Sequence, residues 1–135
     1  MAVQYSTGIR NAMLDAIETA IGTSGVLKVR TGAQPAACSM ADSGTVLATY
    51  SLASDWAAAA SGGSKSFNST PLTVTAAASG TAAHYRLYAS DGTTCHEQGT
   101  ITATGGGGDV TIDNPSITSG QAVSINSFTK TMGGA

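Results

Sequence analysis

Residues 82–104 read AAHYRLYASDGTTCHEQGTITAT, and this stretch decides the class of fold. Its first part, residues 82–90, has the period of two that a half-buried β-strand shows. Two sets alternate there: Ala83, Tyr85, Leu87 and Ala89 against His84, Arg86 and Tyr88. Asp91-Gly92 then favours a tight turn, because both residues tolerate positive φ. We therefore expect an antiparallel hairpin, with residues 93–104 as the returning strand and one of the two tyrosines, 85 or 88, at an exposed or contacted surface.

Shorter segments of the same kind continue on both sides of this hairpin. We expect strands at 25–31, 45–53, around Phe67, 71–76, 109–113 and 122–130, the last with a bulge near Asn126 and Ser127. Residues 32–44 are expected to form a loop, whereas 55–60 fit either a short helical turn or an irregular strand. Turn signals recur about every 8 to 12 residues, which is typical of sandwiches. The expected fold is mainly β, an antiparallel β-sandwich of jelly-roll type with about eight strands.

The chain opens on its one convincing helix, YSTGIRNAMLDAIETAIG at residues 5–22. Ser6 or Thr7 can cap its first turn with a hydroxyl, and Gly22 can end it. Apolar side chains recur every four residues and form a stripe of Ile9, Met13, Ile17 and Ile21. We expect a helix over 6–22 whose stripe either covers one end of the sandwich or packs against a partner.

Length and composition favour a single domain over 1–135, with the helix at 6–22, the β-sandwich body at 25–131 and a flexible tail at 132–135. The formal net charge is −2, and the six basic residues are scattered along the chain. Since nucleic-acid binding needs clustered Lys and Arg, no nucleic-acid partner is expected. Neither a signal peptide nor a membrane-spanning apolar run is visible, so we expect synthesis in the cytoplasm and no membrane partner.

The residue patterns contain no catalytic constellation, so we expect neither an enzyme nor a cofactor. Gly105–Gly108 lacks the Lys and Ser or Thr that follow the glycines of a phosphate loop, and it is interpreted as a flexible hairpin turn. His84, Cys95 and His96 supply too few ligands in too poor a geometry for zinc, so no metal site is expected. Asp109 and Asp113 flank a strand, but Asp beside a turn is ordinary turn chemistry.

The two cysteines, Cys38 and Cys95, leave two outcomes open. A disulfide would close a long loop and stabilise the fold by about 4 kcal/mol, whereas a reducing cytosol favours two free thiols. Trp56, the single tryptophan, fits either a core position or an interface anchor. The interface candidates are therefore the helix stripe, Trp56 and Tyr88.

Five stretches together resemble a group of small virion proteins of tailed bacteriophages. They are YSTGIRNAMLDAIETAIG at 5–22, VLKVRTGAQPA at 26–36, GTVLATYSL at 44–52, GTAAHYRLYASDGTTCHEQGTI at 80–101 and DNPSITSGQAVSINSFT at 113–129. The resemblance covers nearly the whole chain and contains no catalytic motif. Among such proteins, the nearest roles are those of head decoration or cement proteins with a jelly-roll-like body.

The resemblance implies a structural virion component on the head surface. Its expected partners are a major capsid protein of the HK97 fold and other copies of the chain, as a dimer or trimer about the capsid axes. A neck or tail protein is one alternative. A host-glycan-binding adhesin is another, in which exposed Trp56 and Tyr88 would stack on sugars.

Overall fold

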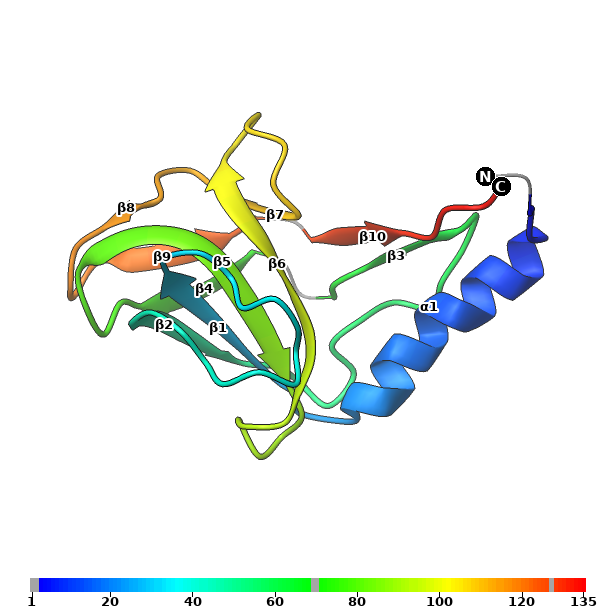
Figure 1. Cartoon of the computed structure of the whole chain (residues 1–135), viewed down its shortest axis with the longest axis horizontal. Helices are drawn as coiled ribbons and strands as arrows, with labels where there is room; N and C mark the ends of the chain where they lie inside the picture. Colours follow the sequence, from blue (N-terminus) through cyan, green and yellow to red (C-terminus); the bar gives the residue numbers. More distant parts are fainter. Residues whose placement is uncertain (1–2, 69–70, 127) are drawn as a thin grey trace.

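The computed structural model describes residues 3–68, 71–126 and 128–135. In these ranges the protein is mainly β, with one N-terminal helix, as the sequence predicts (Figure 1). The helix is α1 (Thr7–Ile21), and the ten strands are β1 (Val26–Thr31), β2 (Val46–Ser51), β3 (Ser64–Ser66), β4 (Leu72–Thr75), β5 (Gly80–Tyr88), β6 (Cys95–Ala103), β7 (Val110–Ile112), β8 (Ser116–Ile117), β9 (Ala122–Ile125) and β10 (Thr129–Thr131).

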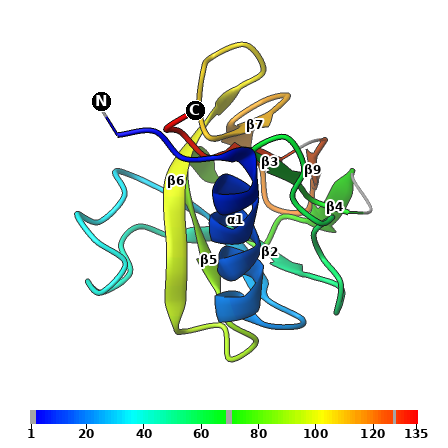
Figure 2. The ribbon, with the colours of Figure 1, turned by 90° about the vertical axis from the view of Figure 1, so that its right-hand side faces the viewer.

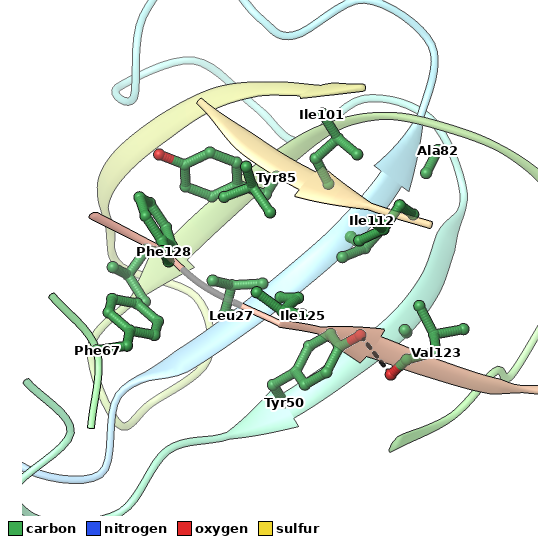
Figure 3. Close-up of a cluster of buried hydrophobic side chains, with 14 of the residues drawn as sticks. Leu27, Tyr50, Phe67, Ala82, Tyr85, Ile101, Ile112, Val123, Ile125 and Phe128 are labelled. Carbon is green, nitrogen blue, oxygen red and sulfur yellow. Dashed lines mark hydrogen bonds between the residues drawn. The ribbon is translucent and has the colours of Figure 1, made fainter. Parts of the chain in front are cut away.

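The main sheet curls and has the order β2-β1-β5-β6-β7, with β8 paired to β5. All its ladders are antiparallel except that of β6 with β7, so the sheet is mixed rather than purely antiparallel. The β4–β9 ladder packs against it: the Tyr50 hydroxyl of β2 donates to the Val123 carbonyl of β9 at 2.9 Å (Figure 3). Two layers therefore enclose one core, which gives a sandwich-like body.

The core fills the space between the curled sheet and the β4–β9 ladder (Figure 3). Alternation along the strands supplies its side chains, among them Leu27, Tyr50, Tyr85, Ile112 and Ile125. At its end near α1, the rings of Trp56, Phe67, Phe128 and Tyr85 contact one another in sequence, mostly edge to face, with centroids 4.6–5.2 Å apart. Such aromatic pairs add to the stability that apolar burial provides.

The central strand β5 is buried on both faces, which the alternating pattern did not predict. Tyr85 and Leu87 point into the core, while His84, Arg86 and Tyr88 lie on the opposite face and are also buried. The expectation that one of the two tyrosines lies at an exposed or contacted surface is therefore wrong, because both are buried within the chain. The reason is that the loop at residues 32–44, the cyan trace in Figure 1, folds over the outer face of the sheet.

The helix is capped as expected: the Ser6 hydroxyl accepts from the Ile9 backbone N–H at 3.3 Å, and Gly22 ends the helix with φ +80°. The expected contact stripe, however, is partly wrong. Leu14 and Ile21 are buried and Ile17 is half-buried, whereas Ile9 and Met13 are 50% and 39% exposed.

Helix α1 packs beside β3 and β6 (Figure 2). Its contact face is rotated because polar side chains share it. Asp15 and Glu18 form ion pairs with buried Lys65 of β3 at 2.7 and 2.6 Å, and Asn11 accepts from the Gly63 N–H at 2.9 Å. These residues lie off the apolar stripe in the sequence pattern. The helix therefore packs within the fold through a mixed face.

Two turn predictions need correction. Residues 105–108 do not form a hairpin turn, because the chain loops back and β7 runs parallel to β6. The connection around Asp91 is longer than a two-residue turn: the strands end at Tyr88 and resume at Cys95, and the Asp91 carboxylate accepts from the N–H groups of Thr93 and Thr94 at 2.9 Å.

The expected last strand, 122–130, is two strands with different partners. The β9 part pairs with β4 and the β10 part pairs with β3. The predicted bulge near Asn126 and Ser127 falls partly outside the described residues, which exclude Ser127.

Residues 132–135, expected to form a flexible tail, are bonded to the rest of the chain. The Gly134 carbonyl accepts from the Tyr5 N–H at 2.6 Å, and the Met132 N–H donates to the Gly63 carbonyl at 2.9 Å. Residues 55–60 contain an isolated bridge from Ala57 to Phe67, not a helical turn.

Candidate functional site

A hollow of about 470 Å³ lies between α1, β6 and β10. Leu14 and Ile17 of the helix form its apolar wall, and Phe128 extends it. Its polar wall comes from the two strands and the loop before β7, and contains Glu97, Gln98, Asp109 and Lys130. A concave surface with an apolar side and converging polar groups is the usual form of a binding site.

The polar wall of the hollow is held by an ion pair between Glu97 and Lys130. The Lys130 ammonium group binds the Glu97 carboxylate and lies 4.1 Å from the centre of the Phe128 ring, while the Tyr85 hydroxyl donates to Glu97 at 2.7 Å. Burial lowers the pKa of Lys130 and raises that of Tyr85. Because the two charges pair with each other, this arrangement fastens β10 to β6.

Gly99 provides the space that this arrangement needs. A Cβ atom at this position would lie 2.7 Å from Tyr85 Cε1 and 2.8 Å from Asp109 Oδ2. We expect Gly99→Ala to reduce the free energy of unfolding by about 1–3 kcal/mol, because the Tyr85 ring must move away from Glu97. Urea denaturation measures this change. Gly133→Ala is the control, since nothing lies within 4 Å of its added Cβ; equal midpoints for the two variants would contradict the prediction.

A second polar cluster fastens the 32–44 loop to the outer face of the sheet. The Arg86 guanidinium, 2% exposed, binds the Asp42 carboxylate and donates to the carbonyls of Ala37, Cys38 and Met40 at 2.9–3.2 Å. Arg30 pairs with the same carboxylate at 2.7 Å. Partial burial opposes ionisation of Asp42, but hydrogen bonds from Tyr88 and Arg86 outweigh it and hold the Asp42 pKa below its usual value.

His84 lies beside this cluster and is buried at the base of the 32–44 loop. Its Nδ1 donates to the Gly32 carbonyl at 2.7 Å, and within the described part of the chain its buried Nε2 has no hydrogen-bond partner. Burial lowers the pKa of His84 more than the Gly32 bond raises it, and the positive charges of Arg30 and Arg86 add to the decrease. His84 is therefore neutral in the folded protein at neutral pH.

We expect the free energy of unfolding to decrease as the pH falls from about 6.5 through the lowered pKa of His84. In that range the unfolded chain binds a proton that the folded protein does not, so acid favours unfolding. Urea denaturation at pH 7.5 and 5.5 tests this. The difference in free energy of unfolding between the two pH values should be smaller in His84→Gln than in the wild type. Exposed His96 supplies the control variant, His96→Gln. The same pH dependence in wild type and His84→Gln would refute the role of His84.

The two cysteines meet at the edge of this second cluster. Cys38 comes from the 32–44 loop and Cys95 begins β6, and their sulfur atoms lie 2.7 Å apart as free thiols. The structure therefore brings the two cysteines together, which is compatible with both a disulfide bond and two free thiols.

Of the six predicted interface residues, only Ile9 and Met13 are exposed. Trp56 is 2% exposed, and its indole N–H donates to the Gly22 carbonyl at 2.9 Å, which joins the body to the end of α1. Tyr88 is buried under the 32–44 loop, with its hydroxyl donating to Asp42 at 2.8 Å. These two aromatic residues, together with Ile17 and Ile21, make their contacts within the chain itself.

Sequence reasoning missed the residues that hold the second cluster, Arg86 and Asp42, and the pair Glu97–Lys130. Arg86 has one sequence signal, a charged residue between Tyr85 and Leu87 in the strongest strand of the chain. No pattern in the sequence links Arg86 to Asp42, because the two lie in segments far apart along the chain.

Within the described ranges, no group of three or more His, Cys, Asp or Glu side chains is arranged to hold a metal ion. The same ranges contain no helix that is long and apolar enough to cross a membrane. Fold and site together define a mainly β, sandwich-like protein with an N-terminal helix and a loop-covered sheet. Comparison with protein-family models, with curated proteins and with solved structures gave no match.

Proposed function

We propose that this chain is a structural component of a tailed-phage virion, a decoration or cement protein on the outside of an assembled head. The observation that supports this proposal is a set of exposed apolar side chains at the start of the chain, which we call the exposed apolar surface. Val3, Tyr5, Ile9 and Met13 are 39–55% exposed on a segment whose other face is fastened to the body. An apolar surface on a rigid body is suited to protein contact. The resemblance to small phage virion proteins suggests that the partner in this contact is a major capsid protein.

In this role the protein needs no reaction chemistry. A decoration protein that binds the assembled lattice, and not the free subunits, stabilises the lattice by its own binding free energy. The exposed apolar surface would contact the major capsid protein at capsomer junctions, and copies of the chain would associate as dimers or trimers around the symmetry axes. The rigid body, with α1 fastened to it by Lys65, presents this surface in one orientation.

Quantitative mass spectrometry of particles purified from the phage that encodes this chain tests the proposal. We expect a copy number comparable to that of the major capsid protein, and heat release of DNA at a lower temperature from particles lacking the chain. A few copies per particle would instead favour a neck or tail protein, and absence from particles would refute a virion role.

A rebinding assay tests the surface itself. Particles lacking the chain should bind the purified protein and the control variant Thr19→Lys/Ala20→Lys, both of whose positions are exposed on α1. They should not bind Ile9→Lys/Met13→Lys. Equal binding of both variants would exclude this surface from the contact. The glycan-binding alternative has lost its expected stacking residues, because Trp56 and Tyr88 are both buried.

A further inference from the structure

The Cys38 and Cys95 thiols face each other across a contact between two separate segments. Their sulfur atoms are in direct contact, which is the placement that formation of a disulfide bond requires. Both residues are half-buried, and Cys95 lies at the first position of β6. The pair is therefore close enough to react without rearrangement of the fold.

The loop that carries Cys38 is held at several points around the thiol. Gln98 donates to the Pro35 carbonyl at 2.6 Å, and Arg86 donates to the Cys38 carbonyl at 2.9 Å. Asp42 fixes the far end through Arg86 and Arg30. These contacts hold Cys38 over the end of β6. Because the loop is already ordered in the reduced protein, disulfide formation costs little additional conformational entropy.

We propose that Cys38 and Cys95 are a redox-active dithiol that closes by exchange with a small-molecule disulfide, such as oxidised glutathione, and locks the 32–44 loop onto the sheet. This proposal does not depend on the proposed function. It assigns a covalent modification site of the thiol–disulfide class. The reduced form belongs to a reducing cytosol and the closed form to an oxidising medium.

The exchange has two steps. The Cys38 thiol loses its proton, and its sulfur attacks one sulfur of oxidised glutathione, which forms a mixed disulfide and releases one glutathione. The Cys95 thiol then loses its proton and its sulfur attacks the Cys38 sulfur, which forms the internal disulfide and releases the second glutathione. The dithiol is oxidised by two electrons, and one glutathione disulfide is reduced to two thiols.

The order of the steps follows from the surroundings of Cys95. Burial, with the hydrogen bond to Cys38, raises the pKa of the Cys95 thiol to about 12. Since the thiolate is the nucleophile, Cys95 is a poor first attacker. Formation of the mixed disulfide removes the part of this shift that the Cys38 thiol causes and leaves Cys95 beside the Cys38 sulfur for the resolving step.

Incubation of the full chain with an excess of oxidised glutathione tests closure. We expect an intact mass about 2 Da lower than that of the reduced protein, with no alkylatable thiol left and the fold retained. Cys38→Ser and Cys95→Ser should each stop at one thiol or a glutathione adduct. The double variant Cys38→Ser/Ser39→Cys is the matched control, since it moves the thiol to the next, exposed position and should not close.

Amide hydrogen exchange tests the lock. We expect exchange in residues 32–44 to slow by about tenfold or more on oxidation, with little change in β4 and β9. Persistence of two alkylatable thiols, accumulation of the wild-type protein as a glutathione adduct, or an intermolecular disulfide would overturn the proposal. Closure without slower exchange in the loop would overturn the lock.

Discussion

Replacing Arg86 with Met should free the 32–44 loop from the sheet and reduce the free energy of unfolding by about 3 kcal/mol. The substitution leaves the Asp42 carboxylate with a single cationic partner, Arg30, and removes the donor from three loop carbonyls. A buried ion pair that loses one partner costs about 3–5 kcal/mol. We expect the lower end of that range, because the Asp42 side chain is 37% exposed and water can solvate part of its charge.

Urea denaturation followed by circular dichroism measures the loss, and hydrogen exchange locates it in residues 32–44. Arg10→Met is the matched control, because within the described part of the chain the Arg10 guanidinium forms no ion pair and donates to the Thr7 hydroxyl and, at 3.5 Å, to the Met132 carbonyl. Asp42→Asn should loosen the same loop from the opposite side of the ion pair. If Arg86→Met has the wild-type unfolding midpoint and loop protection, the cluster does not hold the loop.

Leu14→Ala should reduce the free energy of unfolding by about 2–5 kcal/mol, whereas Met13→Ala should change it by no more than about 0.5 kcal/mol. The two residues are neighbours in the same helix, so their substitutions have similar effects on helix propensity. Leu14 is 1% exposed against the body and Met13 is 39% exposed. The difference between the two variants therefore measures the packing of α1 on the body.

Chemical denaturation of the two variants in parallel checks this prediction. The Met13→Ala protein should retain its fold, which also makes it usable in the particle-binding assay. Similar losses in both variants would mean that the contact face of α1 includes Met13. No loss in either would mean that the helix does not pack on the body.

Local sequence patterns predicted the elements because each depends on neighbours along the chain. The helix over 6–22 followed from a capping serine, an apolar repeat and a terminal glycine, and the structure has it at Thr7–Ile21. The β5 and β6 strands followed from alternation, and the loop at 32–44 followed from its turn-forming residues. The candidate site was only partly predictable: the Cys38–Cys95 pair was named, but the residues of its surroundings were not.

What the sequence by itself determined is the class of fold, one N-terminal helix before a mainly β body, since periodicity and turn chemistry are local properties. Tertiary structure alone decided which faces are covered. Alternation marks Arg86 and Tyr88 as the outer face of a strand, and only the return of the 32–44 loop buries them with Asp42. Likewise, Lys65 draws Asp15 and Glu18 inward and turns Ile9 and Met13 to the surface. The physical reason is that burial and ion pairing depend on segments far apart in the chain, and no local pattern records which segments will meet.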